Sequence, residues 1–438
     1  MRLMPLLVIG FFVAAVFQLV RFSGQADGLP LPPPVNSEHA EIDAGVDRVN
    51  SWFRDQWKSR NIVPAASADD LTVFRRLHLA LLGTIPSLQD IRVFEADTEG
   101  NRIERWVDRL LKDPRYASYM AQRIARSLVG TEDGPFLIFR RDRLVAWLES
   151  QLQHDEPWSQ ISQELISADG LWTDRPATNF ITSARIDEDE IDENKLAGRV
   201  ARVFLGQRID CAQCHDHPFD PRWKQSDFEG LAAFFCQATV SLAGVKDRRK
   251  DDQGQDIVYR VVDPGKTDSD ARVVKPVVPF NSEWLSSHDG LRLCLSNWVT
   301  HRDNQRFGRA AANRIWGLMF GKPYIVPVDD VPHPSDESID PLDILGNEFR
   351  KNGDRLSTLI RMIARSEVFR LSSEETAGTP DEFTVLQDSW AVFPLTRLRP
   401  EQVIGSLFQA AHIRTINHQS HLFIRIQKYG NENDFIHC

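Results

Sequence analysis

Short amphipathic helices, bounded by capping residues and prolines, are the feature that most constrains how this chain folds. The first clear stripe follows a capping stretch at 67–70 and consists of Leu71, Phe74, Leu77 and Leu81. This spacing places all four apolar side chains on one helical face. A helix with one apolar face needs another helix or sheet to cover it. The sequence therefore predicts a mainly α-helical protein in which short helices pack on one another.

Comparable stripes predict further helices on both sides of a polar interruption. They are expected at 87–94, 103–111, 144–152, 158–166, 195–206, 227–235, 291–300, 307–320, 341–349, 356–367 and 398–412.

The polar interruption at 241–285 divides the chain into two parts. Its alternating runs Ile257–Val262 and Arg272–Val278 predict a small β-hairpin or two edge strands. We interpret this region as the junction between a helical domain at 45–240 and a mainly helical domain at 286–438.

The chain ends without a polar tail, and its last segment is expected to be a truncated form of the second domain. Leu407 and Phe408 lie on the final helix and would then be left partly uncovered. The alternative is a shortened domain that closes its own core, with Phe435 and Ile436 docked on it.

Composition narrows the class of protein. The 52 basic and 62 acidic side chains give a net charge of −10, which argues against a nucleic-acid partner. A hydrophobic content of 42%, with 25 Phe and 11 Trp, excludes disorder for the chain as a whole. The five cysteines are too few and too scattered for a disulfide-dense secreted scaffold.

The N-terminus predicts attachment to a membrane. Leu3–Val20 is apolar apart from Gln18 and just long enough to cross a bilayer. We interpret residues 1–22 as a signal anchor, with an unusual cleaved signal peptide as the alternative. Residues 23–44 form a stiff, Pro-rich linker. The expected location is a single-pass attachment to the cell membrane, with the body in the periplasm or otherwise outside the cytoplasm.

The motif Cys211-Ala-Gln-Cys214-His215 carries the clearest chemistry in the sequence. In an exported protein, Cys-x-x-Cys-His is typical of covalent attachment of a c-type haem. Two thiols three positions apart are able to reach both vinyl groups of one porphyrin, and the adjacent imidazole is then placed to bind the iron. The predicted cofactor is haem c, with Cys211, Cys214 and His215 as its attachment residues.

Two other interpretations of the same residues stay open. Zinc is the stronger, because His217 follows closely and Cys236 is a further thiol able to serve as a ligand. A disulfide between Cys211 and Cys214 is the other. A second axial haem ligand is not determined by the sequence; the chemically able residues are Met120, Met319, Met362, His288, His301 and His333.

The residues around the motif resemble a known family. The run Arg202–Phe219 is similar to the planctomycete cytochrome-type domain of uncharacterised function that bears this motif, and so are 74–86 and 147–170. The second half resembles the usual planctomycete partner domain, also uncharacterised, at 297–330 and 359–373. The resemblance implies a surface or periplasmic protein with a haem-type motif and no established reaction. The stretch 332–337 departs from the partner family's pattern.

One further constellation combines carboxylates with guanidinium groups. Asp329 and Asp330 follow Arg309, Asn313 and Arg314. Paired carboxylates beside Arg are able to bind a metal or polarise a substrate, but we favour a structural network that locks a helix against a loop.

No nucleophile elbow or Gly-rich phosphate loop is present in the sequence, so no catalytic residue is assigned. The sequence predicts electron transfer or redox sensing in the cell envelope, with an unknown redox or envelope protein as partner. The alternative is a non-haem envelope protein, either a zinc-stabilised interaction module or a component of polysaccharide handling.

Overall fold

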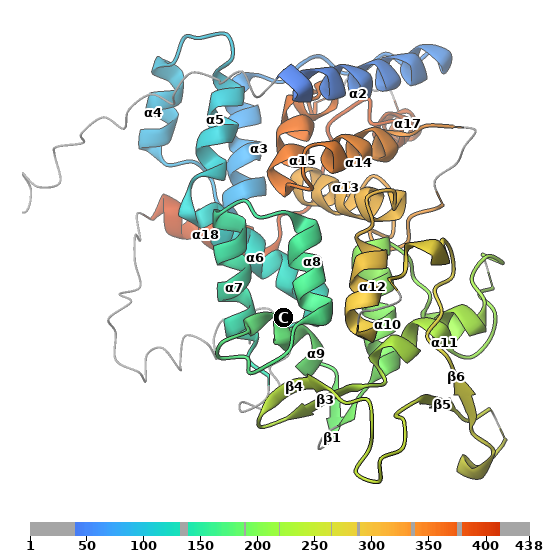
Figure 1. The fold of residues 1–438 in the computed structure, drawn as a ribbon. Coiled ribbons are helices and arrows are strands. Elements are labelled where there is room, and N and C mark those ends of the chain that lie inside the picture. Colours follow the sequence, from blue (N-terminus) through green and yellow to red (C-terminus); the bar gives the residue numbers. More distant parts are fainter. Residues whose placement is uncertain are drawn as a thin grey trace, which may run out of the picture.

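The computed structural model describes residues 40–131, 139–187, 190–218, 220–263, 265–286, 290–333, 338–374 and 379–411. It confirms a mainly helical protein (Figure 1). The predicted anchor at 1–22, nearly all of the linker at 23–44, and Cys438 lie outside these ranges. Within them, the structure contains no helix whose length and apolar character would allow it to cross a bilayer.

Most helices follow the predicted stripes, whereas those at 40–59, 114–129, 179–182 and 380–388 lie outside the predicted ranges. In the first part of the chain they are α2 (Ala40–Ser59), α3 (Asp70–Leu82), α4 (Leu88–Ala96), α5 (Arg102–Leu111), α6 (Pro114–Val129), α7 (Arg141–Gln153), α8 (Trp158–Ser167), α9 (Asn179–Thr182), α10 (Glu193–Val200) and α11 (Gln225–Ala232). In the second part they are α12 (Leu291–Val299), α13 (Gln305–Phe320), α14 (Pro341–Lys351), α15 (Leu356–Arg365), α16 (Glu367–Arg370), α17 (Pro380–Asp388) and α18 (Pro400–Ala410).

Local chemistry explains where the predicted helix α3 begins and ends. The Asp69 side chain accepts a hydrogen bond from the backbone N–H of Thr72 at 2.9 Å, which satisfies one of the free donors of the first turn. The helix ends at Gly83, whose φ of 66° is a left-handed conformation that favours glycine. The capping residue therefore lies inside the stretch 67–70 that the sequence indicates.

Three small antiparallel hairpins interrupt the helices. In the junction, β5 (Tyr259–Val261) pairs with β6 (Arg272–Val274), which confirms the predicted hairpin. A second hairpin, β3 (Ala238–Ser241) with β4 (Gly244–Asp247), is not indicated by the sequence pattern. The acidic stretch 187–193 is expected to be a solvated loop, but β1 (Arg185–Asp187) pairs there with β2 (Glu190–Ile191). Buried Ile191 gives β2 an inward face that the charge pattern hides.

The two parts of the sequence interlock in space. Figure 1 shows α2, α3 and α5 grouped with α13, α14 and α15, whereas α7 to α12 and the hairpins lie together below them. Helix α2 packs on α14 and α15, α3 on α13, and α5 on α15. One continuous hydrophobic core runs through both parts. The junction at 241–285 therefore separates two segments of sequence that share a core.

An aromatic cluster forms the centre of the upper group. Trp316 of α13 is fully buried, and its ring lies 6.0 Å from that of Phe53 on α2 and 4.5 Å from that of Phe320. Tyr324 and Trp390 meet the same indole edge-on, at 5.6 and 5.1 Å. Offset and edge-to-face ring pairs are favourable beyond their buried area. The cluster thus joins α2, the first helix of the described residues, to the second part.

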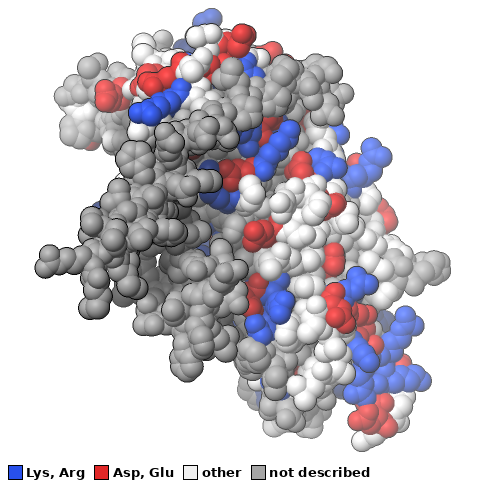
Figure 2. Space-filling view, turned by 90° about the vertical axis from the view of Figure 1, so that its left-hand side faces the viewer, with Lys and Arg blue, Asp and Glu red and all other residues white. Residues whose placement is uncertain are grey.

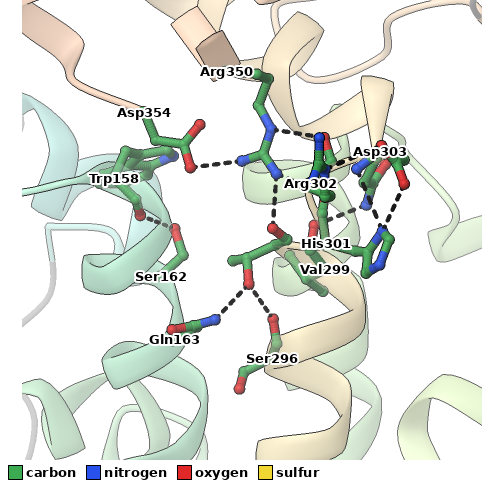
Figure 3. Close-up of polar contacts among 12 residues, drawn as sticks. Trp158, Ser162, Gln163, Ser296, Val299, His301, Arg302, Asp303, Arg350 and Asp354 are labelled. Atoms are coloured by element: carbon green, nitrogen blue, oxygen red, sulfur yellow. Dashed lines mark hydrogen bonds and ion pairs between the residues drawn. The ribbon is translucent and has the colours of Figure 1, made fainter. Parts of the chain in front are cut away.

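Arg350 of α14, a half-buried residue, connects the upper group to the end of α12 in the lower group. Figure 3 shows Arg350 of α14 at the end of α12, where its Nη2 donates to the carbonyls of Thr300 at 2.8 Å and His301 at 2.6 Å. Gln163 of α8 donates to the hydroxyl of Thr300 at 2.8 Å. Thr300 is the C-cap of α12 and His301 follows it, so Arg350 binds the chain directly after the helix.

The described surface mixes both signs of charge. On the face drawn in Figure 2, acidic and basic side chains are interspersed among neutral ones. Several arginines of the surface lie beside a carboxylate, as in the pairs Arg222–Asp220 and Arg202–Asp210.

Candidate functional site

The cysteine motif lies on an exposed turn that follows a widened helical segment. Helix α10 continues into η3 (Ala201–Leu205), a π-helical stretch that ends at Gly206 with a φ of 62°. The sequence predicts one regular helix over this range, and its last turn is instead π-helical. Such stretches occur frequently at functional sites. Here η3 brings the chain from the buried core to the surface just before the motif.

The two thiols project from one tight turn. Cys211 lies in the 3-10 helix η4 (Asp210–Gln213), and Cys214 ends it, with its N–H 3.4 Å from the Cys211 carbonyl. Side chains three residues apart in a 3-10 helix lie one above the other. Both cysteines are exposed, and no disulfide joins them. The turn therefore presents two free thiols to solvent on the same side.

His215 follows the turn with one ring nitrogen engaged. Its Nδ1 lies 2.7 Å from the backbone carbonyl of Asp216. A carbonyl only accepts, so Nδ1 carries a proton, and the neutral form of the ring keeps its lone pair on Nε2. Metal-ligating histidines ordinarily donate their other ring N–H to a carbonyl or carboxylate in this way. The imidazole is thus prepared to ligate through Nε2.

His217 has a different role, because backbone groups engage both of its ring nitrogens. Its Nδ1 accepts from the N–H of Asp220 at 3.0 Å, and its Nε2 donates to the carbonyl of Arg208 at 3.1 Å. Its own N–H donates to the carbonyl of Trp223 at 2.9 Å. His217 therefore connects the segment before the motif to the segment after it through hydrogen bonds. As a zinc ligand it would have to give up one of these bonds.

The remaining residue of the zinc alternative, Cys236, is half-buried at the end of a short helical turn. Burial, together with the negative charge of Glu193, raises the pKa of its thiol to about 11. A neutral thiol is a poor metal ligand. In the described ranges, no three His, Cys, Asp or Glu side chains come together as a group able to hold a metal ion.

Acidic side chains hold the motif turn in place. Asp216 accepts from the N–H of Gln225 at 3.0 Å and from Nζ of Lys224 at 3.2 Å, and these contacts lower its pKa. At the other end, Asp210 pairs with Arg202 at 3.1 Å. Polar contacts therefore hold the turn at both ends, and the fully buried Ala212 in its middle packs it on the core.

The constellation predicted around Asp329 and Asp330 divides into two groups in the structure. Arg309 pairs with Asp340, the N-cap of α14, through two hydrogen bonds of 2.9 Å, and also with Asp343. Asn313 holds the loop that leads to the acid pair, with its Nδ2 donating to the carbonyls of Ile325 and Val328 at 3.0 and 3.1 Å.

The acid pair itself meets residues that the sequence pattern does not indicate. Asp329 binds Nε of Arg208 at 2.8 Å, and Asp330 binds Nε2 of Gln207 at 3.0 Å. Arg314 is half-buried; desolvation lowers its pKa, and the charge of Asp329 opposes this shift. The carboxylates of the second part thus reach the segment directly before the cysteine motif.

The candidates for a second axial ligand are dispersed. Met120, Met319 and Met362 are buried in the core. His301 stacks on the indole of Trp284 with a ring separation of 4.4 Å. His288 lies outside the described residues, so the structure assigns no second axial ligand.

Comparison with known families supports the domain pair. Residues 48–240 match PSCyt2, described as a protein of unknown function (DUF1549), and residues 291–426 match PSD1, described as a protein of unknown function (DUF1553). This pair of domains is typical of planctomycetes. Searches of curated proteins and of solved structures returned no match. The predicted resemblance to the domain pair is confirmed, while the cytochrome-type interpretation of the motif stays a prediction.

Proposed function

We propose that this chain, with its PSCyt2 and PSD1 domains, attaches a c-type haem through Cys211, Cys214 and His215 and passes or senses electrons in the cell envelope. The observation that carries the proposal is the state of His215. Its Nδ1–H is held by a backbone carbonyl at 2.7 Å, directly beside two exposed thiols on one turn. Free thiols and a prepared imidazole are the donor set that covalent haem attachment requires.

The chain's residues have distinct tasks in this proposal. Each thiol adds across one vinyl C=C bond, with sulfur bonding to one carbon and the thiol hydrogen going to the other, so no oxidant is consumed. His215 supplies Nε2 to the iron while the Asp216 carbonyl keeps the ring oriented. When bound, the haem supplies a one-electron Fe(III)/Fe(II) couple. His217 supports the turn without ligating.

Export and attachment to the membrane belong to the same proposal. The apolar segment Leu3–Val20 supports an anchor, and the Pro-rich linker would space the body from the bilayer. The protein would then exchange electrons with a redox partner of the envelope.

The decisive experiment is expression of the full chain with a haem-attachment machinery. We expect a Soret band that persists through denaturing electrophoresis and disappears in the double variant Cys211→Ser, Cys214→Ser. The matched control is Cys236→Ser, which removes a half-buried thiol outside the motif and should leave the band unchanged.

Two outcomes contradict the proposal. One is a purified chain that contains stoichiometric zinc and no haem absorbance, which supports the zinc alternative. The other is a covalent haem that survives loss of both motif cysteines.

A further inference from the structure

We infer that Asp329 and Asp330 are positioning residues for the loop at 206–224, here called the cysteine loop. The second domain then sets the geometry of the site that the first domain carries. This inference rests on the proposed function, because it assigns these carboxylates a role at the same site. It assigns them no contact with the cofactor.

The acid pair is itself held rigidly by α13. The Asn313 side chain makes three hydrogen bonds to the loop, two through Nδ2 to the carbonyls of Ile325 and Val328 and one accepted by Oδ1 from the Ile325 N–H at 2.9 Å. Directly after the pair, the N–H of Val331 donates to the carbonyl of Gly206 at 2.7 Å. Backbone pairing thus joins the second domain to the end of the π-helical stretch.

From this support the two carboxylates reach the segment before the motif. Asp329 accepts from Nε of Arg208 at 2.8 Å. Asp330 accepts from Nε2 of Gln207 at 3.0 Å and from the backbone N–H of Arg208 at 3.4 Å. Gln207 is buried, whereas Arg208 is exposed. The carboxylates therefore orient both side chain and backbone three residues ahead of Cys211.

The contacts continue from this segment to the far end of the loop. The carbonyl of Arg208 accepts from Nε2 of His217, whose N–H donates to the carbonyl of Trp223. Arg306 of the second domain donates to Oε1 of Gln207 at 2.8 Å, and its guanidinium lies 5.4 Å from the indole of Trp223. The second domain thus contacts both ends of the loop that carries the thiols and His215.

Stability alone explains this arrangement poorly. Exposed ion pairs such as Arg208–Asp329 contribute little to the free energy of unfolding. The interlocked core already joins the two domains. The same contacts are well placed to restrict the loop, because they act on the backbone that leads into it. A positioning role predicts a local change at the thiols with little change in overall stability.

The test compares Asp329→Asn, Asp330→Asn and the double variant with wild type in the full chain. Two measurements are needed: alkylation rates of individual cysteines by iodoacetamide in the haem-free chain, and the redox potential of the haem-loaded chain. The matched control is Asp388→Asn, which removes an exposed carboxylate of the same domain, 3.4 Å from Lys322.

We expect the double variant to raise the alkylation rates of Cys211 and Cys214 about two- to fivefold, the scale of a surface ion pair. Cys236 should keep its rate, and the control should match wild type. The redox potential should shift in the double variant and keep its wild-type value in the control. Arg208→Ala breaks the same contact from the other side and should reproduce the effect if an Asp variant folds poorly.

The outcomes separate the two proposals. Unchanged alkylation and an unchanged potential in variants that retain haem overturn the positioning role and leave the proposed function intact. Absence of haem in the wild-type chain overturns the proposed function, whereas the alkylation rates still decide whether Asp329 and Asp330 position the loop. A uniform rise at all three cysteines indicates general loosening and contradicts the inference.

Discussion

The aromatic cluster around Trp316 and the cysteine loop differ in how much of their geometry depends on polar contacts. The cluster buries large rings from α2, α13 and the segment near Trp390, so apolar contact maintains it. The loop exposes Cys211 and Cys214; hydrogen bonds and ion pairs hold its outer side, and the buried Ile209 and Ala212 pack it on the core. A loop fixed in this way presents reactive groups to solvent while keeping a defined shape. The comparison predicts a large energetic effect in the cluster and a mainly local one at the loop.

The largest effect is expected from Trp316→Ala in the cluster. Removing a fully buried indole leaves a cavity among four rings, so we expect a loss of about 4 kcal/mol in the free energy of unfolding. Urea denaturation followed by circular dichroism measures it. Trp316→Phe should cost much less, because within the described structure the indole Nε1 has no hydrogen-bond partner. Val63→Ala, at an 81% exposed position, serves as the neutral control.

Arg292→Met tests a polar contact inside the core. Arg292 is 1% exposed and donates to Asp247 at 2.7 Å and to the carbonyl of Ala168 at 2.9 Å. The change removes the donor of the buried Ile166 carbonyl and of the partly buried Ala168 carbonyl, so a loss of about 3 kcal/mol in the free energy of unfolding is expected. Differential scanning calorimetry should show a lower Tm. A Tm equal to that of wild type would show that the contact is dispensable.

His78 makes stability depend on pH. Burial lowers the pKa of this imidazole to about 4, near Asp90, Asp113 and Arg115, so the unfolded chain binds the proton first. Stability attributable to His78 is therefore complete above about pH 6.5 and decreases as the pH falls toward 4, by about 2–3 kcal/mol. His78→Leu should flatten this part of the profile. Urea midpoints at pH 7.5 and 4.5 give the comparison, and equal slopes in both proteins would contradict it.

The smallest effect is expected from His217→Ala in the cysteine loop. The change removes two side-chain hydrogen bonds to backbone, which is worth about 1 kcal/mol in the free energy of unfolding. Haem retention, measured by the covalent Soret band, should persist because His217 is not a ligand in the proposed function. Complete loss of the cofactor in a folded variant would favour a site in which both histidines are ligands.

The helices could largely be predicted from sequence, because their signals are local. The stripe from Leu71 to Leu81 and the capping residue Asp69 lie within a few turns of each other. The π-helical stretch at 201–205 could not, since its apolar pattern is that of an ordinary helix. The hairpin of β1 and β2 could not be predicted for a similar reason. Acidic residues dominate 187–193, and only Ile191 marks its buried face.

The candidate site shows the same division. The proximity of Cys211, Cys214 and His215 follows from their spacing alone. The partners of Asp329 and Arg309 do not follow from sequence spacing. Arg208 is 121 positions from Asp329, and Asp340 is one of several acids within reach of Arg309. Sequence spacing suggests which groups are able to pair but does not choose among them.

By itself, the sequence determined the short-range features of this protein: mainly helical structure, the apolar face of each helix, and two thiols and an imidazole within one turn. Backbone geometry enforces these within a few residues. The tertiary structure alone decided that α2 packs against helices of the second part and that backbone groups bind both ring nitrogens of His217. It also decided that Asp329 and Asp330 reach the cysteine loop. Such contacts depend on how whole helices pack, and packing is set by the combined shape of side chains far apart in the chain.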